Sequence, residues 1–203
     1  MLRYLLFCLL FGCATISTWA QEDGEPVDDD DRLFRFSVWV AGNAAQIDGD
    51  DLAGYDKLGL NIGGRVFIRL HENWQPSIGI NYTQKGSSSE LLGSSDLQTK
   101  YSLDYAQIPV MFNYVDQRII FSVGLAYGQL VRSSVVRQGL PDDGILDLYR
   151  NFDFSFIGGA TFFVTDHIGF TLAWERSLIN LITDPTQQSQ VNKLITLGAG
   201  YQF

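Results

Sequence analysis

The sequence contains few of the residues on which catalytic and metal sites most often depend. It has two cysteines, Cys8 and Cys13, and two histidines, His71 and His167. Both cysteines lie in an N-terminal segment that we expect to be removed, so the mature chain would have no thiol, no disulfide and no cysteine metal site. No stretch of the chain forms a basic face, which argues against nucleic acid as a partner.

Long hydrophobic runs are also missing. After the N-terminus, no segment approaches the roughly 18 apolar residues of a membrane-spanning helix. The sequence is nevertheless 46% hydrophobic and 13% aromatic, which is too apolar for a disordered protein. Its apolar residues are spread over short segments in which they alternate with polar or small residues, and this period of two predicts β-strands.

The N-terminus has the pattern of a secretory signal peptide. Arg3 supplies a positive charge, residues 2–16 form an apolar core, and Thr18-Trp19-Ala20 is a plausible cleavage site, so we expect residues 1–20 to be removed. The alternative is a lipoprotein box at residues 10–13, which would leave a lipidated Cys13. We favour cleavage after Ala20, because Phe11 fits such a box poorly and the apolar run continues past Cys13.

Residues 21–32 form an acidic leader. Seven acids, Glu22, Asp23, Glu25, Asp28, Asp29, Asp30 and Asp31, account for most of the formal net charge of −9. A run of like charges repels itself and stays extended, so we interpret this segment as disordered and solvated. The remainder, residues 33–203, is a single predicted domain.

Eight alternating segments bounded by turn residues follow the leader. They are Leu33–Asn43, Leu58–Leu70, Gln75–Lys85, Tyr101–Tyr114, Arg118–Val131, Phe152–Val164, His167–Arg176 and Val191–Phe203. At about 10 to 14 residues each, tilted strands of this length can cross a membrane. The connections after the second, fourth and sixth segments are short, and the others are long and rich in Gly, Asp, Ser or Gln. Short turns at one rim and long loops at the other are typical of bacterial outer-membrane barrels, with both termini in the periplasm.

The two faces of these segments indicate which side meets lipid. In Val191–Phe203, one face carries Ile195, Leu197 and Tyr201, and the other carries Thr196, Gly198 and Gly200. A face in bulk water would be expected to carry Lys and Glu, whereas small residues suit the crowded interior of a small barrel. We therefore predict an all-β protein, an eight-stranded antiparallel up-and-down transmembrane β-barrel in the outer membrane. A soluble barrel with the apolar face inside is the alternative.

The fourth segment changes rhythm. Tyr101, Leu103 and Tyr105 follow one phase, whereas Ala106 and Ile108 begin the other. A β-bulge near Tyr105 to Gln107 would reconcile the two phases.

Three motifs resemble a known family. They are Gly42-Asn43 followed by an acidic loop, the stretch Gly54-Tyr55-Asp56-Lys57-Leu58-Gly59, and Tyr105-Ala106-Gln107-Ile108-Pro109-Val110, which is similar to a Tyr-x-x-Ile-Pro-hydrophobic signature. From Leu33 to Phe203 the chain resembles the PorT-like outer-membrane β-barrel proteins of Bacteroidota, often labelled "porin family" proteins. One member of that family is tied to protein secretion across the outer membrane, but no residue pattern here carries that role over. The family assigns no catalytic residues.

Enzymatic activity is disfavoured. Small outer-membrane enzymes generally use a histidine base at the outer rim, whereas His71 and His167 fall in the predicted periplasmic turns. The acidic clusters Asp48, Asp50, Asp51 and Asp142, Asp143, Asp147 offer the oxygen ligands that Ca²⁺ and Mg²⁺ prefer. They lack EF-hand spacing, so we interpret them as solvated loop acids and assign no metal, no cofactor and no catalytic residue.

Charged residues at inward positions are the candidate site. We expect these charges to pair or to hold water, because an isolated buried ion is very costly. A polar network that blocks the lumen is the favoured interpretation, and a gated ion or small-solute path is the alternative. The predicted network comprises Arg35, Arg65, Arg69, Arg118, Lys85, Asp104, Asp153 and Glu175.

The leading functional prediction is a non-enzymatic barrel with a structural or surface-interaction role. Its expected partners are outer-membrane lipids and lipopolysaccharide, the barrel-assembly machinery through the C-terminal strand that ends at Phe203, and other envelope proteins. Transport of ions or small solutes, or an accessory role in protein secretion, is the alternative.

Overall fold

The computed structural model describes residues 32–50, 54–88, 99–137, 140–141, 149–183 and 188–203. The expected signal peptide and the acidic leader up to Asp31 lie outside the described residues. The described part of the chain contains no helix that could span a bilayer.

Nine strands occur within the described residues. They are β1 (Phe34–Asp48), β2 (Lys57–Ile68), β3 (Trp74–Ser88), β4 (Thr99–Asp116), β5 (Ile119–Arg137), β6 (Leu140–Pro141), β7 (Phe152–Phe163), β8 (Ile168–Ser177) and β9 (Val191–Gln202). Eight of them correspond to the segments predicted from alternation. The additional strand, β6, is two residues long and pairs with the end of β5.

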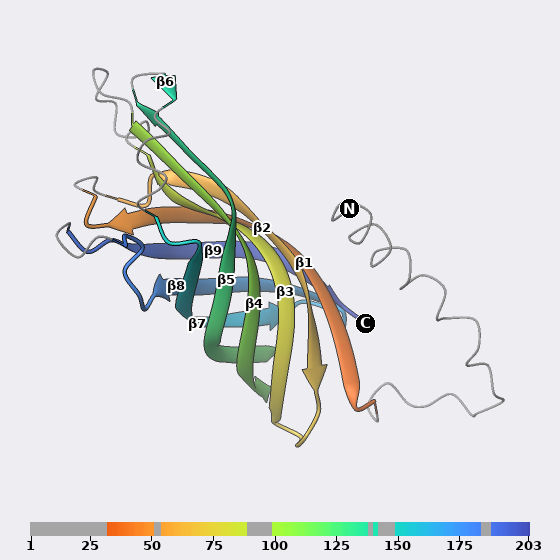
Figure 1. Cartoon of the computed structure of the whole chain (residues 1–203). Helices are drawn as coiled ribbons and strands as arrows, with labels where there is room; N and C mark the ends of the chain where they lie inside the picture. Colours follow the sequence, from red (N-terminus) through yellow and green to blue (C-terminus); the bar gives the residue numbers. More distant parts are fainter. Residues whose placement is uncertain (1–31, 51–53, 89–98, 138–139, 142–148, 184–187) are drawn as a thin grey trace, which may run out of the picture. The chain divides into compact units, whose positions relative to one another are not determined.

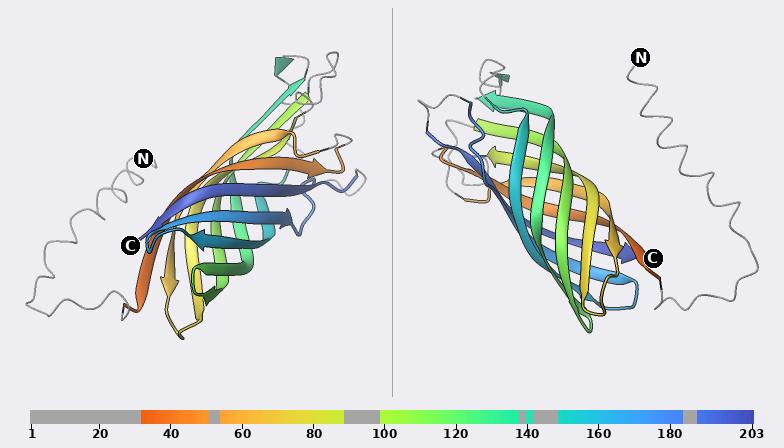
Figure 2. Two further views of the ribbon diagram at one scale, coloured as in Figure 1. Left: turned by 180° about the vertical axis from the view of Figure 1, so that it is seen from behind. Right: turned by 60° about the horizontal axis from the view of Figure 1, so that its bottom comes forward.

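The sheet closes on itself. Its strand order is β4-β3-β2-β1-β9-β8-β7-β5-β6, with a further pairing between β4 and β5, and every pairing is antiparallel. Figure 2 shows the strands wrapping obliquely around one axis. The predicted fold class, a closed eight-stranded antiparallel barrel, is therefore confirmed. Closure gives each of the eight barrel strands a hydrogen-bonded partner on both sides. No strand edge is therefore left with a row of unpaired backbone N–H and C=O groups.

Short turns and long connections segregate to opposite rims. The short-turn rim holds the connections β2–β3, β4–β5 and β7–β8, and the long-loop rim holds β1–β2, β3–β4, β5–β7 and β8–β9. In the β4–β5 turn, Gln117 has a φ of 51°, as tight hairpin turns often require. The Phe203 amide donates to the Phe36 carbonyl at 2.8 Å, so the first and last strands meet at the short-turn rim (Figure 1).

The outward face is apolar, as predicted. Ile80 is 66% exposed, Leu172 56% and Leu197 65%, each on a different strand. Such side chains would be unfavourable in water over so continuous a surface, whereas a lipid phase accommodates them. The inward face carries the small and polar residues, so the soluble-barrel alternative, with its apolar face inside, is wrong.

The irregularity predicted in the fourth segment has a different cause. Tyr101, Leu103, Tyr105, Gln107 and Met111 all face inward, so the alternation of β4 is unbroken. The register between β4 and β5 does shift, between Asp104 and Tyr105. The extra residue lies on β5, where Val131 has no partner in the register. Up to Tyr105 the apolar residues of β4 fill the lumen, and from Ala106 they lie on the outward face. This exchange produces the apparent change of phase in the sequence.

Glycine makes room inside the barrel where large side chains cross it. A Cβ on Gly63 would come within 2.7 Å of the Trp39 indole and 2.5 Å of the Ile80 carbonyl oxygen. A Cβ on Gly198 would meet Ala41 on the neighbouring strand. The glycines of the inward face therefore let adjacent strands and the Trp39 ring approach closely, as the narrow interior of an eight-stranded barrel requires.

Candidate functional site in the barrel lumen

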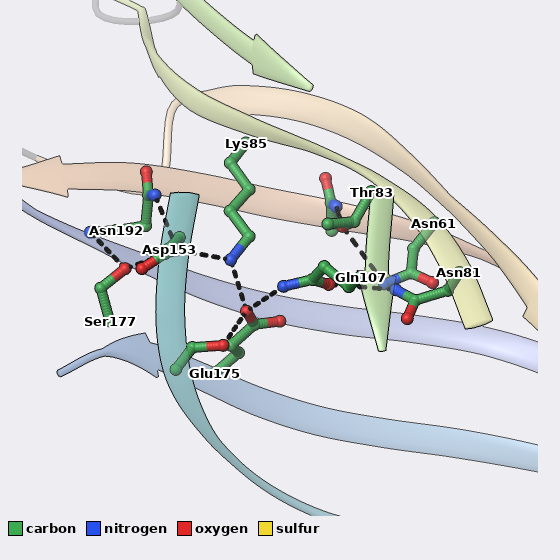
Figure 3. Close-up of polar contacts among 11 residues, drawn as sticks. Asn61, Asn81, Thr83, Lys85, Gln107, Asp153, Glu175, Ser177 and Asn192 are labelled. Carbon is green, nitrogen blue, oxygen red and sulfur yellow. Dashed lines mark hydrogen bonds and ion pairs between the residues drawn. The ribbon is translucent and has the colours of Figure 1, made fainter. Parts of the chain in front are cut away.

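A buried ion cluster joins opposite walls of the barrel. The Lys85 ammonium lies 2.9 Å from Asp153 Oδ2 and 2.5 Å from Glu175 Oε1, and the three residues are 0%, 0% and 5% exposed. β3, which carries Lys85, is separated from β8, which carries Glu175, by three strands in either direction around the barrel. The Lys85–Glu175 contact therefore spans the lumen (Figure 3).

Neutral polar residues complete this cluster. Glu175 Oε1 also accepts hydrogen bonds from Gln107 Nε2 at 2.8 Å and from Ser155 Oγ at 2.7 Å. Asp153 Oδ2 accepts from Ser177 Oγ at 2.8 Å and from Asn192 Nδ2 at 3.3 Å. Each carboxylate is thus held by several donors, which offsets the desolvation cost of burying two anions with one cation. We call these seven residues the ion plug.

A chain of amides extends from the ion plug along the inner wall. Gln107 Oε1 accepts from Asn81 Nδ2 at 3.0 Å. Beside it, Thr83 Oγ1 accepts from Asn61 Nδ2 at 3.3 Å and from Asn43 Nδ2 at 3.2 Å (Figure 3). Buried polar groups are costly unless they are hydrogen-bonded, and this chain gives β1, β2, β3 and β4 polar contacts with one another inside the lumen.

An apolar cluster lies on the long-loop side of the ion plug. It comprises Ile47, Tyr101, Leu103, Tyr105, Val135, Tyr149 and Leu181. Leu103 is the cross-strand partner of Lys85, and Tyr149 and Ile182 form an isolated bridge between two long connections. The Lys85 ammonium also lies 5.1 Å from the centre of the Tyr105 ring. Two groups of side chains therefore fill the long-loop half of the lumen: the ion plug, and next to it the aliphatic and aromatic residues of the apolar cluster.

The predicted charged residues divide between the two ends of the barrel. Lys85, Asp153 and Glu175 come together in the ion plug. Arg35, Arg69 and Arg118 lie at the short-turn rim, where Arg118 Nη1 donates to the Val164 carbonyl at 3.2 Å. Arg65 lies inside the lumen in the short-turn half, with its guanidinium carbon 5.2 Å from the Trp39 ring centre and 5.8 Å from that of Phe67.

Asp104 does not join the ion plug. It lies on the face of β4 that also carries Ala106 and Ile108, opposite to the face of Leu103 and Tyr105. Its Oδ2 accepts a hydrogen bond from the Tyr82 hydroxyl at 2.6 Å. The reason is the unbroken alternation of β4, which turns Asp104 away from the lumen.

A cavity occupies the short-turn half of the lumen. It offers about 110 Å³ of space to water-sized molecules. Its walls include Ser37, Arg65, Phe67, Met111 and Gln202, and Glu175 lines it at the side of the ion plug. A single water needs roughly 10–15 Å³ by this measure, so the cavity has room for several waters or a small organic molecule.

The two histidines lie at the short-turn rim. His71 is an exposed turn residue, and His167 Nδ1 lies 2.9 Å from the Gln202 carbonyl while its ring stacks on Tyr201 at 5.3 Å. Of the acidic clusters, Asp48 contacts Lys193 at 2.6 Å, and Asp51, Asp142, Asp143 and Asp147 lie outside the described residues. Among the described residues, no group of three or more His, Cys, Asp or Glu side chains could hold a metal.

Sequence reasoning missed the neutral members of the ion plug. Gln107, Ser155, Ser177 and Asn192 are all 2% exposed or less. Strict alternation along each strand assigns them to the inward face. For Gln107, the apparent change of phase in the fourth segment hid this inward orientation. Which inward residues meet across the lumen depends on how the strands are staggered in the closed barrel, and no single segment contains that information.

Comparison with known proteins agrees with this architecture. A family model described as "Outer membrane protein beta-barrel domain" matches residues 19–183. No curated protein matches the sequence. The crystal structure of Ail, the attachment invasion locus protein of Yersinia pestis, is similar with a TM-score of 0.52 and 12% identity, covering 85% of this chain and 100% of Ail. Neisserial surface protein A (NspA) is similar with a TM-score of 0.53 and 11% identity, covering 83% of this chain and 97% of NspA. A further structure shows Ail in complex with the heparin analogue sucrose octasulfate. At these identities the likeness establishes the fold alone.

Proposed function

Because this chain belongs to the outer membrane protein β-barrel domain family, we propose that it is a non-enzymatic barrel of a Gram-negative outer membrane with a structural or surface-interaction role. The observation that carries this proposal is the Lys85–Glu175 contact across the lumen, which lies beneath an apolar cluster. A lumen filled in this way supports a scaffold that presents its long loops, because water and ions would have to break a buried ion pair to pass.

Planar-bilayer recordings of the purified, folded chain test this proposal. We expect no unitary currents, because the ion plug and the apolar cluster both obstruct the path. Folding should be checked independently by the shift in electrophoretic migration between unheated and heated samples. Stable currents that scale with salt concentration would contradict the scaffold role.

A narrow or gated passage is the second candidate, and the cavity in the short-turn half favours it. Space for water reaches Glu175 from one side, so only the long-loop half separates this space from the opposite rim. If the ion plug is a gate, Glu175→Gln should weaken its contact with Lys85 and raise the frequency of unitary currents. Silent recordings from both the wild type and Glu175→Gln would exclude this candidate.

The orientation follows from the arrangement of the rims. We place the short-turn rim and both termini in the periplasm and the long loops outside the cell. Because both cysteines precede residue 20, single cysteines at the exposed positions Ser189 and Glu72 can report the orientation. A membrane-impermeant maleimide on intact cells should label Ser189→Cys and spare Glu72→Cys, and the opposite pattern would overturn the assignment.

Two partners follow from this placement. The outer surface would contact lipopolysaccharide, and a higher melting temperature in lipopolysaccharide vesicles than in phosphatidylglycerol vesicles would support that contact, whereas equal melting temperatures would contradict it. The barrel-assembly machinery would recognise the C-terminal strand, so Phe203→Ala should lower the amount of folded barrel in cells while leaving refolding in detergent unchanged. An unchanged amount in cells would contradict this second role.

The finer placement among PorT-like proteins of Bacteroidota rests on the motifs at residues 54–59 and 105–110. It remains a prediction from the sequence, as does an accessory role in protein secretion. Failure to co-purify any envelope protein after crosslinking in the native membrane would contradict the secretion role. The PorT-like placement would be contradicted if the sequences most similar to this chain came from bacteria outside Bacteroidota.

A further inference from the structure

Arg65 is a half-buried cation that has no counter-charge among the described residues. Within the described residues it makes no hydrogen bond or ion pair, and its Nε is buried without a partner. Its guanidinium instead lies against Trp39 and Phe67, which provide only the weaker attraction of aromatic rings. In a narrow lumen that screens charge less than bulk water does, a cation without a counter-charge favours an anion beside it.

Two further donors stand in the same row of the barrel wall. Ser37 on β1 is the cross-strand partner of both Arg65 on β2 and Gln202 on β9. All three residues line the cavity, and Gln202 is only 8% exposed with its Nε2 buried and unpartnered among the described residues. Neighbouring strands lie roughly 4.8 Å apart, so a guanidinium, a hydroxyl and an amide donor form a continuous strip across three neighbouring strands.

The rest of the cavity specifies the kind of anion. Beyond this strip its walls are largely apolar and include Phe67, Met111, Ile120 and Phe163. Glu175 lies at the side of the ion plug, and its Oε1 is already occupied by three donors. The carboxylate of Glu175 repels a second anion from that side, so negative charge is favoured beside Arg65 and an apolar group beside the hydrophobic walls.

We propose that this cavity binds a small organic carboxylate, with its carboxylate on the Arg65–Ser37–Gln202 strip and its hydrocarbon part against Met111, Ile120 and Phe163. Planar guanidinium groups recognise carboxylates through paired, charge-assisted hydrogen bonds. The apolar walls favour an organic anion over an inorganic one, because a fully hydrated ion would lose its water without replacement. This inference goes beyond the proposed function and does not depend on whether the lumen conducts.

The test uses ¹⁵N nuclear magnetic resonance of arginine Nε–H groups in the whole folded barrel, reconstituted in nanodiscs. Sodium butyrate is the probe, titrated at constant ionic strength against sodium chloride. We expect a saturable shift of the Arg65 signal with butyrate, a weaker response to acetate, and no saturation with chloride. No saturable shift with butyrate would overturn the proposal, and equal saturation by chloride would overturn the assignment to a carboxylate.

Matched variants locate the site, and their butyrate affinity is followed by the indole Nε1–H signal of Trp39, which also lines the cavity. Arg65→Gln should reduce butyrate affinity roughly ten- to a hundredfold, as expected for the loss of a charge-assisted hydrogen-bond pair. Arg118→Gln removes an arginine of the short-turn rim and should leave the affinity unchanged. Gln202→Leu, which keeps the cation, should reduce the affinity severalfold and serves if Arg65→Gln does not fold. Butyrate affinity unchanged in both Arg65→Gln and Gln202→Leu would place the ligand elsewhere and contradict the proposal.

Discussion

The two halves of the lumen are enclosed by the same eight strands and yet are filled differently. In the long-loop half, the inward positions carry Lys85, Leu103, Tyr105 and Leu194, all 0% exposed. In the short-turn half, many inward positions carry serine or glycine, and a cavity remains. Because a closed barrel has a nearly constant radius, the size of the inward side chains decides whether a level is plugged or hollow.

The two halves have different roles, with the long-loop half stabilising the barrel and the short-turn half offering a binding cavity. Contacts in the long-loop half join non-neighbouring strands across the lumen, and we expect them to stabilise the closed barrel. The short-turn half gives up such contacts and leaves Arg65 and Gln202 with unpartnered donors. Buried polar atoms without partners occur in both halves: in the ion plug they are the acceptors Asp153 Oδ1 and Asn192 Oδ1, whereas beside the cavity they include the donors Arg65 Nε and Gln202 Nε2. Three matched pairs of variants test these differences: one compares the buried ion pair with a half-exposed ion pair near the long-loop rim, and two compare the long-loop half with the short-turn half.

The largest difference is expected between two lysines. Lys85→Met removes the cation of the ion plug and leaves Asp153 and Glu175 buried without it, which should lower the free energy of unfolding by about 3–5 kcal/mol. Lys193→Met removes a lysine whose partner, Asp48, has a side chain that is 45% exposed, and should cost about 0–1 kcal/mol. Urea unfolding of the barrel in lipid vesicles, followed by tryptophan fluorescence, measures both.

The combined variant Lys85→Met, Asp153→Asn, Glu175→Gln is the control for charge. It removes both signs together, so we expect it to recover most of the stability lost in Lys85→Met. If the combined variant is less stable than Lys85→Met, the cost arises from lost packing and the electrostatic account of the ion plug is wrong.

An intermediate difference is expected between two apolar residues. Leu103→Ala opens a cavity in the fully packed cluster and should cost about 3–5 kcal/mol. Met111 is 2% exposed but lines the existing cavity, so Met111→Ala only enlarges a space already present and should cost ~2 kcal/mol or less. Equal losses in the same urea experiment would show that the two halves are equally well packed.

The smallest difference is expected between two serines. Ser155 Oγ donates to the Glu175 carboxylate and Ser122 Oγ donates to the Asn113 amide oxygen, each at 2.7 Å. A hydrogen bond to a charged group contributes about 1.5–3 kcal/mol and a neutral one about 0.5–1.5 kcal/mol. Ser155→Ala should therefore be the more destabilising, and a larger loss in Ser122→Ala would contradict the order.

Much of the fold could be predicted because a period of two is a local property. The turn residues marked the ends of eight strands, and the apolar face of Val191–Phe203 indicated which side of the sheet is outside. The one misreading, at Tyr101 to Tyr105, arose because aromatic and aliphatic residues fill the lumen there. Alternation by itself does not distinguish an apolar face that meets lipid from an apolar face that fills the lumen.

The candidate site was only partly predictable, because alternation describes each strand separately. Alternation indicates that Lys85, Asp153, Glu175 and Arg65 point inward, since this depends on their own strands. It does not indicate that Lys85 meets Glu175, or that Arg65 meets neither carboxylate directly. Those outcomes depend on where strands distant in the sequence come to face each other.

The sequence by itself determined the position of the strands, their two faces and the number of strands in the barrel, because each depends on the spacing of residues within one segment. Only the tertiary structure decided the contents of the lumen. Closure places β3 opposite β8, and the stagger of the strands sets the height at which each inward side chain lies. Charges that share a face in the sequence therefore separate into a buried ion plug at one level and a lone cation at another.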